Sequence, residues 1–253
     1  SLTSDEFDHL QWSLSNNEQL WGVIGADIQA MDAWGVTHGS DTITIAVLDE
    51  GVDLTHPDLA AKLVSGYDAT DGGGSGGPSG DDAHGTACAG IAGAVTDNSL
   101  GVAGIDREAR IMPVRIAYSD ETGSWVTLDS WIADAIDWAV ENGADVLSNS
   151  WGGGSPATVI NEAIADTRAG AARRNVIVFT ATGSNQMMDT LRAKLEEERK
   201  HMRSFSMVAS YDVEDYNKYI YNPARLPEAG SRCRADGYRA PLPVSGPGIR
   251  RSL

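Results

Sequence analysis

A short apolar run that ends in two acids constrains the fold of this chain more than any other feature. Residues 42–48 are β-branched or apolar over the length of one strand, and the run stops at Asp49, Glu50 and Gly51. A continuous apolar run of this kind predicts a parallel strand that is buried on both faces of a sheet. We therefore expect the strand to deliver the Asp49 carboxylate to the carboxyl edge of the sheet.

A histidine follows this strand at the start of a predicted helix. His84 comes after a Gly- and Ser-rich loop, residues 71–82, and it opens the apolar segment H-G-T-A-C-A-G. The loop is too rich in Gly and Ser to pack, and it separates Asp49 from His84 in the sequence. We expect the sheet, and not the loop, to hold the two residues near one another. An imidazole at a helix start beside a carboxylate at a strand end is the base and its orienting partner in a hydrolytic triad.

Strands and helices alternate further along the chain. Strand, helix and strand at this spacing imply right-handed crossovers and a parallel sheet that is covered on both faces. We predict strands over residues 111–116, 146–148 and 176–180, and helices over residues 131–142 and 157–170.

The strand and helix segments that carry the acid and the histidine resemble the subtilisin-like serine proteases. Residues 45–59 are I-A-V-L-D-E-G-V-D-L-T-H-P-D-L, where the family shows V-A-V-x-D-x-G-h-D-x-x-H-P-D-L, and the segment from His84 matches H-G-T-x-x-A-G. The resemblance runs from about residue 5 to about residue 221 and is nearest to the kexin and furin branch and its bacterial relatives. It implies an α/β fold of three layers, in which helices cover both faces of a mainly parallel central sheet.

One motif of the family is absent from the sequence. The nucleophilic serine of subtilases lies in a later G-T-S-x-x-x-P motif, which occurs nowhere in these 253 residues. We therefore expect an incomplete catalytic domain over residues 1–221, with the C-terminal part of the fold missing or divergent, and an irregular Pro/Gly/Arg-rich tail over residues 222–253. A truncated or frame-shifted gene, a divergent tail and a docking arm all remain open.

Charge narrows the range of partners. The sequence has 36 acidic and 19 basic residues, which gives a formal charge of −17. Such a balance argues against nucleic acid and anionic membranes as partners, because both need a basic surface. We expect a secreted protein whose partner is a polypeptide substrate. A propeptide, or a chain that supplies the missing C-terminal part, would be a further partner.

The resemblance assigns substrate contacts to two segments. Ser150, Trp151 and Gly152 match the family's S-x-G edge, which pairs with an extended peptide, although core packing is the alternative for Trp151. In the kexin-like branch an acid directly after the catalytic Asp helps to select basic residues. Glu50 would take this role, or it is a surface carboxylate.

The donor to the oxyanion is ambiguous in the sequence. The family shows A-x-G-N, and residues 181–185 are A-T-G-S-N. Either the loop shifts by one residue and Asn185 donates to the oxyanion, or Ser184 occupies the donor position. Loss of such a donor costs roughly 10²–10³ in rate.

Two cysteines, Cys88 and Cys233, are too few for a disulfide framework. Cys88 comes one helical turn after His84, and a Cys–His nucleophile is one interpretation of this spacing. Cysteine at this position is a small core residue in the branch that the sequence resembles. We therefore predict a buried, structural thiol.

The resemblance also implies a structural calcium site. Two carboxylates and four neutral oxygens suit Ca²⁺, whereas Mg²⁺ keeps more of its waters. For Asp5, the alternative is a solvated acidic residue of the N-terminal segment. Carried over position by position, the ligands are the carboxylates of Asp5 and Asp58, the amide oxygen of Asn98, and the backbone carbonyls of Val95, Leu100 and Val102.

Two functions follow from this sequence. The first is a calcium-stabilised endopeptidase that hydrolyses peptide bonds by Asp-His-Ser chemistry and has little activity as given, because the serine is absent. The second is a catalytically dead relative that uses the same peptide-binding edge as an interaction module. In both, Asp49 and His84 lie at one edge of the sheet.

Overall fold

The computed structural model describes residues 3–18, 24–152, 157–169 and 176–180. Within them, five strands form one sheet in the order β2-β3-β1-β6-β7, and every neighbouring pair is parallel. This order places β1, the strand that ends at Asp49, in the centre. The strands are β1 (Thr44–Asp49), β2 (Tyr67–Asp68), β3 (Arg110–Arg115), β6 (Val146–Asn149) and β7 (Ile177–Thr180).

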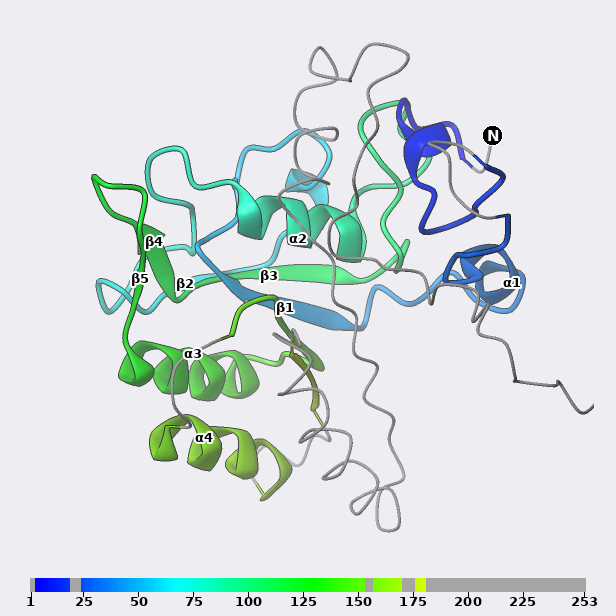
Figure 1. Ribbon diagram of the computed structural model, residues 1–253. Helices are drawn as coiled ribbons and strands as arrows, with labels where there is room; N and C mark the ends of the chain where they lie inside the picture. The colour runs from blue at the N-terminus through cyan, green and yellow to red at the C-terminus, as the bar shows by residue number, and fades with distance from the viewer. Residues whose placement is uncertain (1–2, 19–23, 153–156, 170–175, 181–253) are drawn as a thin grey trace, which may run out of the picture.

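Different helices cover the two faces of the sheet (Figure 1). Helix α2 (His84–Gly93) lies on one face, and α3 (Asp129–Glu141) and α4 (Thr158–Ala169) lie on the other. Helices α3 and α4 and strands β1, β3, β6 and β7 begin and end within two residues of the predicted bounds, whereas the short strand β2 was not predicted. None of the described helices combines the length and the apolar character that crossing a bilayer takes.

The side chains of β1 alternate between the two faces. Ile45 and Val47 join the apolar cluster that includes α2, whereas Ala46 and Leu48 join the larger cluster that includes α3 and α4. A strand with both faces in a core has no position for a polar side chain until it ends. The predicted three-layer α/β fold is therefore confirmed, and the carboxylates appear only where β1 leaves the core.

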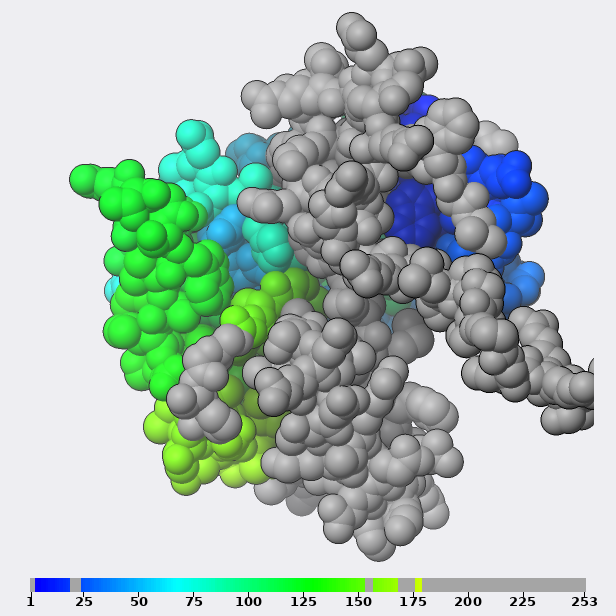
Figure 2. Space-filling view, in the orientation of Figure 1, coloured from blue at the N-terminus to red at the C-terminus, as the bar shows by residue number. Residues whose placement is uncertain are grey.

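A hairpin that the sequence analysis did not predict follows the central strands. Strands β4 (Ala117–Ser119) and β5 (Trp125–Thr127) pair in antiparallel fashion, and Figure 2 shows the hairpin projecting from one edge of the molecule. Its turn is closed by Asp120, whose Oδ1 accepts the N–H groups of Thr122 and Ser124. An Asx turn of this kind is the local signal that could have predicted it.

The N-terminal arm is fastened to the rest of the domain by amide groups. It contains the short helices η1 (Asp8–Leu10) and α1 (Ala30–Trp34); a third short helix, η3 (Ala60–Lys62), precedes β2. Gln11 makes two hydrogen bonds of 2.8 Å with the backbone of Ala103, one from its Nε2 and one to its Oε1. This bidentate contact holds the arm, and with it Asp5, against the loop that precedes β3.

Candidate active site

Asp49 is the last residue of β1, and it is 1% exposed. The register pairs it with Arg115 of β3 on one side, and Leu48 pairs with Asn149 of β6 on the other. The carboxylate therefore lies at the carboxyl edge of the sheet, where ligands bind in open parallel sheets. Within the described part of the chain, Asp49 Oδ2 is buried and has no hydrogen-bond partner.

His84 is the first residue of α2, and its ring meets this carboxylate. Nδ1 of His84 lies 2.8 Å from Oδ1 of Asp49, and 29% of the histidine side chain is exposed. Burial lowers the pKa of His84, but the hydrogen bond to Asp49 and its negative charge raise the pKa by more than burial lowers it. The pKa of His84 therefore lies above its ordinary value. The pair is close, charge-assisted and open to solvent on the histidine side.

Two glycines make the close approach of α2 to β1 possible. A Cβ on Gly85 would lie 2.2 Å from the carbonyl oxygen of Gly51 and 2.9 Å from the Cβ of Asp49. Gly51 itself has a φ of 103°, which side chains other than glycine rarely allow. The glycines of the D-E-G and H-G-T segments are thus required by packing between two segments that are distant in the sequence.

Glu50 is buried beside the pair. It is 7% exposed, its N–H donates to Asp49 Oδ1 at 2.9 Å, and its Oε1 accepts the N–H of His84 at 2.7 Å. The alternative of a surface carboxylate is therefore wrong. No motif in the sequence indicates this contact, which joins two residues that are 34 apart.

Cys88 lies under the imidazole. Its Sγ is 3.8 Å from Nδ1 of His84, the residue is 7% exposed, and it belongs to the apolar cluster between α2 and the sheet. Burial raises the pKa of the thiol, which disfavours the thiolate that a nucleophile requires. The prediction of a buried core cysteine is confirmed.

The predicted substrate edge follows β6 directly. Ser150 lies close enough to Cys88 to lower the pKa of its thiol, against the larger effect of burial, which places Ser150 beside α2. The Nε1 of Trp151 donates to the carbonyl of Leu48 at 2.8 Å, and its ring packs against the larger core cluster. Gly152 follows, and it is exposed. Core packing therefore accounts for the indole, and the segment is tied to β1 one residue before Asp49.

The predicted oxyanion donors, Ser184 and Asn185, lie outside the described residues. So do the boundary proposed at residue 221 and the tail over residues 222–253. Their roles stay predictions.

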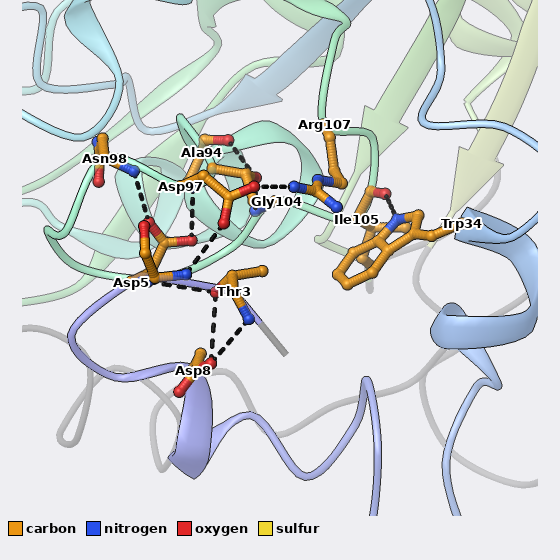
Figure 3. A network of polar contacts seen from close by, with 12 residues as sticks. Thr3, Asp5, Asp8, Trp34, Ala94, Asp97, Asn98, Gly104, Ile105 and Arg107 are labelled. Atoms are coloured by element: carbon orange, nitrogen blue, oxygen red, sulfur yellow. Dashed lines mark hydrogen bonds and ion pairs between the residues drawn. The ribbon is translucent and has the colours of Figure 1, made fainter. Parts of the chain in front are cut away.

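A second group of buried carboxylates lies between the N-terminal arm and the loop after α2. Figure 3 shows Asp5 facing Asp97 and Asn98, whose backbone N–H groups donate to its two carboxylate oxygens at 3.0 Å. Asp58 accepts Nδ2 of Asn98 at 2.7 Å and the N–H of Val102 at 2.9 Å. The structure thus brings the predicted ligands Asp5, Asp58, Asn98 and Val102 together.

A model of the subtilase family matches residues 40–228. The chain belongs to the subtilase family. It is 40% identical over 157 residues to thermitase of Thermoactinomyces vulgaris, a match that covers 62% of this chain and 52% of thermitase. It is 36% identical over 144 residues to a calcium-dependent protease of Trichormus variabilis, covering 56% of this chain and 20% of that protein.

Among solved structures, a protease of Pseudoalteromonas arctica PAMC 21717 superposes with a TM-score of 0.57 at 31% identity, covering 74% of this chain and 60% of that one. The subtilase chain spans about half the length of thermitase. These matches agree with the observed fold, and the matched proteins are named as proteases.

The acidic group of this subtilase fits a hard cation. Asp5 and Asp58 are 4% and 2% exposed; burial raises the pKa of Asp58, and the charge of Asp5 adds to the rise. A Cβ on Gly101 would lie 2.2 Å from Oδ2 of Asp58, so the loop wraps closely around that oxygen. Two buried carboxylates of like charge are the donor set that Ca²⁺ neutralises.

The amide group of Asn98, a predicted ligand, points its nitrogen and not its oxygen toward Asp58. Asn98 presents its Nδ2 to Asp58, and its Oδ1 accepts the N–H of Leu100 at 2.8 Å. Rotation of the amide group about its last torsion would bring the oxygen toward the carboxylates. Of the other backbone ligands, Val95 donates its N–H to the carbonyl of Asp58 at 2.8 Å, which holds this side of the loop in place.

Thr86 is a further residue of this subtilase site that the sequence analysis did not single out. It is 2% exposed, and its Oγ1 accepts the N–H of Asp53 at 2.9 Å. The bond joins the H-G-T segment to the loop after β1, so it helps to fix the start of α2. The only sequence signal for it is its place in the motif itself.

Proposed function

We propose that this chain carries the Asp and the His of a subtilisin-like serine endopeptidase that hydrolyses peptide bonds by an Asp-His-Ser mechanism. The supporting observation is the 2.8 Å contact between Asp49 Oδ1 and His84 Nδ1 at the carboxyl edge of the central sheet. In this mechanism Asp49 accepts a hydrogen bond from Nδ1–H of His84, which leaves Nε2 as the base that takes a proton from the serine. The partial exposure of His84 is consistent with access for that serine and for a peptide.

Substrate contacts belong to the edge after β6. Ser150, Trp151 and Gly152 pair with an extended peptide by strand addition, and Asn185 donates to the oxyanion. Glu50 next to Asp49 is the feature that supports the kexin and furin branch, in which this acid favours basic residues in the substrate. Strict dibasic specificity is not expected.

The sequence contains no G-T-S-x-x-x-P motif. We therefore propose that the chain as given hydrolyses peptides at no more than a residual rate. Its partners would be a polypeptide substrate and a propeptide or a chain that supplies the serine, and its location would be extracellular. If no serine is ever supplied, the same edge would serve as a peptide-binding module.

A fluorophosphonate probe tests the missing serine directly. We expect the folded chain to remain unlabelled, with the variant His84→Ala as the control for background reaction. Labelling of a defined serine that is lost in His84→Ala would contradict the proposed inactivity and would show an active protease.

A chimera tests the proposed mechanism. Residues 1–180 would be joined to the segment of an active subtilase that carries the G-T-S-x-x-x-P motif. We expect this chimera to hydrolyse a peptide substrate and the variants Asp49→Asn and His84→Ala to lose the activity. A chimera that folds and hydrolyses peptides equally well with either substitution would overturn the proposal.

Calcium is proposed as a structural cofactor. Asp5 and Asp58 would bind it by carboxylate oxygen, Asn98 by its amide oxygen, and Val95, Leu100 and Val102 by backbone carbonyls. When bound, the ion neutralises two buried carboxylates and ties the N-terminal arm to the loop after α2. The relative named as a calcium-dependent protease supports the same proposal.

A further inference from the structure

The amino end of α2 lacks an acceptor of its own. Ala83 stands at the N-cap position and makes no side-chain hydrogen bond to the helix, and the first turn contains no acidic residue. The first N–H groups of a helix have no partner within the helix, so another part of the protein or water must supply one. At α2 that partner is Glu50, whose Oε1 accepts the N–H of His84 at 2.7 Å.

Three hydrogen bonds close a ring through Asp49, Glu50 and His84. The N–H of Glu50 donates to Asp49 Oδ1 at 2.9 Å, and the same oxygen contacts Nδ1 of His84 at 2.8 Å. The N–H of His84 in turn donates to Glu50. His84 is therefore held at two points, by its ring and by its backbone, and the two supports are adjacent residues of one strand end.

The surroundings favour this arrangement over a free carboxylate. Glu50 is 7% exposed, and it lies at the positive end of the α2 dipole. Burial raises the pKa of Glu50, the hydrogen bond from His84 lowers it, and the charges of Asp49 and Asp82 raise it again. A buried acid beside another acid is stable only where such donors meet it, so the contact with His84 N–H is what allows Glu50 to be there.

We propose that Glu50 is a positioning residue, which fixes the first residue of α2 so that the ring of His84 meets Asp49. This role rests on the proposed Asp–His function of the site. It is separate from any contact between Glu50 and a basic substrate, since it needs only the oxygen that accepts the His84 N–H. Loss of Glu50 would disturb the imidazole even when no substrate is present.

Histidine NMR on the full chain tests the proposal without requiring activity. The readouts are the Nδ1–H resonance of His84, assigned with His84→Gln, and the titration of its ring. Asp49 and Cys88 contact the ring, Glu50 accepts the backbone N–H of His84, and the charge of Asp82 acts on Glu50. In Glu50→Ala we expect the Nδ1–H resonance to broaden or vanish and the proton affinity of His84 to fall about tenfold, because the ring is less well held against Asp49. Glu50→Gln keeps an acceptor oxygen and removes the charge, so the resonance should persist with a smaller fall.

Two controls make the result decisive. Glu141→Ala removes an exposed acid at the end of α3 and should change neither readout. Asp49→Asn should lower the proton affinity of His84 strongly; if it does not, the Asp–His pair itself, and so the proposed function, fails. Wild-type behaviour of His84 in both Glu50 variants, with the Asp49→Asn effect intact, would overturn the positioning role alone. If Glu50→Ala does not fold, the titration of Glu50→Gln decides the matter by the same criterion.

Discussion

Two regions of this subtilase bury carboxylates in different ways. At the carboxyl edge of the sheet, the strand end itself places Asp49 and Glu50, and an imidazole meets the first of them. Between the N-terminal arm and the loop after α2, Asp5 and Asp58 are met by backbone N–H groups and one amide side chain. Among the described residues, no lysine or arginine forms an ion pair with Asp5 or Asp58.

The difference shows how the partner of a buried acid determines its use. An imidazole can gain and lose a proton at ordinary pH, so the first region suits proton transfer. The N–H groups that meet Asp5 and Asp58 donate hydrogen bonds but carry no net charge, so they leave the negative charge of the second region in place. Such a region suits a bound cation. The predictions below test this contrast.

The largest expected effect is on turnover in the active chimera. Asp49→Asn removes the charge that orients His84, so kcat should fall by about 10³–10⁴, or about 4–5.5 kcal/mol of transition-state stabilisation. Steady-state kinetics on a peptide substrate measures it. The matched variant Asp58→Asn, assayed with excess calcium, should change kcat by less than about tenfold; a larger loss would erase the contrast between the two regions.

The next effect concerns calcium and the second region. A chelator should lower the Tm. When the free calcium concentration is about 100 to 1,000 times the Kd, removing the ion lowers the free energy of unfolding by about 2.7–4.1 kcal/mol. Calorimetry with calcium, and with NaCl of equal ionic strength, measures the change. Asp58→Asn should abolish most of the calcium response, whereas Asp41→Asn, which removes an exposed acid, should keep it. An identical melt with and without calcium would count against the site.

The close approach of α2 to β1 predicts an asymmetry between two glycines of the same helix. Gly85→Ala should destabilise the fold by about 1–3 kcal/mol, since its Cβ would lie 2.2 Å from the Gly51 carbonyl oxygen. Gly90→Ala places its Cβ no closer than 4.0 Å to its nearest neighbour, a side-chain atom of Val102, and should stabilise the helix by up to about 1 kcal/mol. Urea unfolding of both variants tests this, and equal effects would argue against the packing.

The smallest expected effect is a pH dependence of stability. Because the pKa of His84 is raised in the folded state, its pairing with Asp49 stabilises the fold fully below the ordinary histidine pKa of about 6.5. That contribution is lost as the pH rises from there through the raised pKa. The Tm of the wild type minus that of His84→Gln should therefore decrease from about pH 6 upward. A difference that grows with pH would contradict the sign.

Part of this site could be predicted from the sequence because its signals are local. The apolar run before Asp49 and the segment from His84 each specify one element, and the parallel sheet brings their ends to one edge. Asp5, Asp58 and Asn98 were likewise assigned from short motifs, and they lie together in the structure. Their catalytic and calcium-binding roles stay predictions.

The sequence by itself determined the alternation of strands and helices, since period acts over a few residues, and the motifs shared with subtilases predicted that Asp49 meets His84. The central place of β1 came from the structure. Only the tertiary structure decided that Glu50 caps α2, that Gly85 must lack a side chain and that Trp151 donates to Leu48. The reason is physical: each of these contacts joins groups more than 30 residues apart, and their strength depends on distances that exist only after the sheet and α2 have packed.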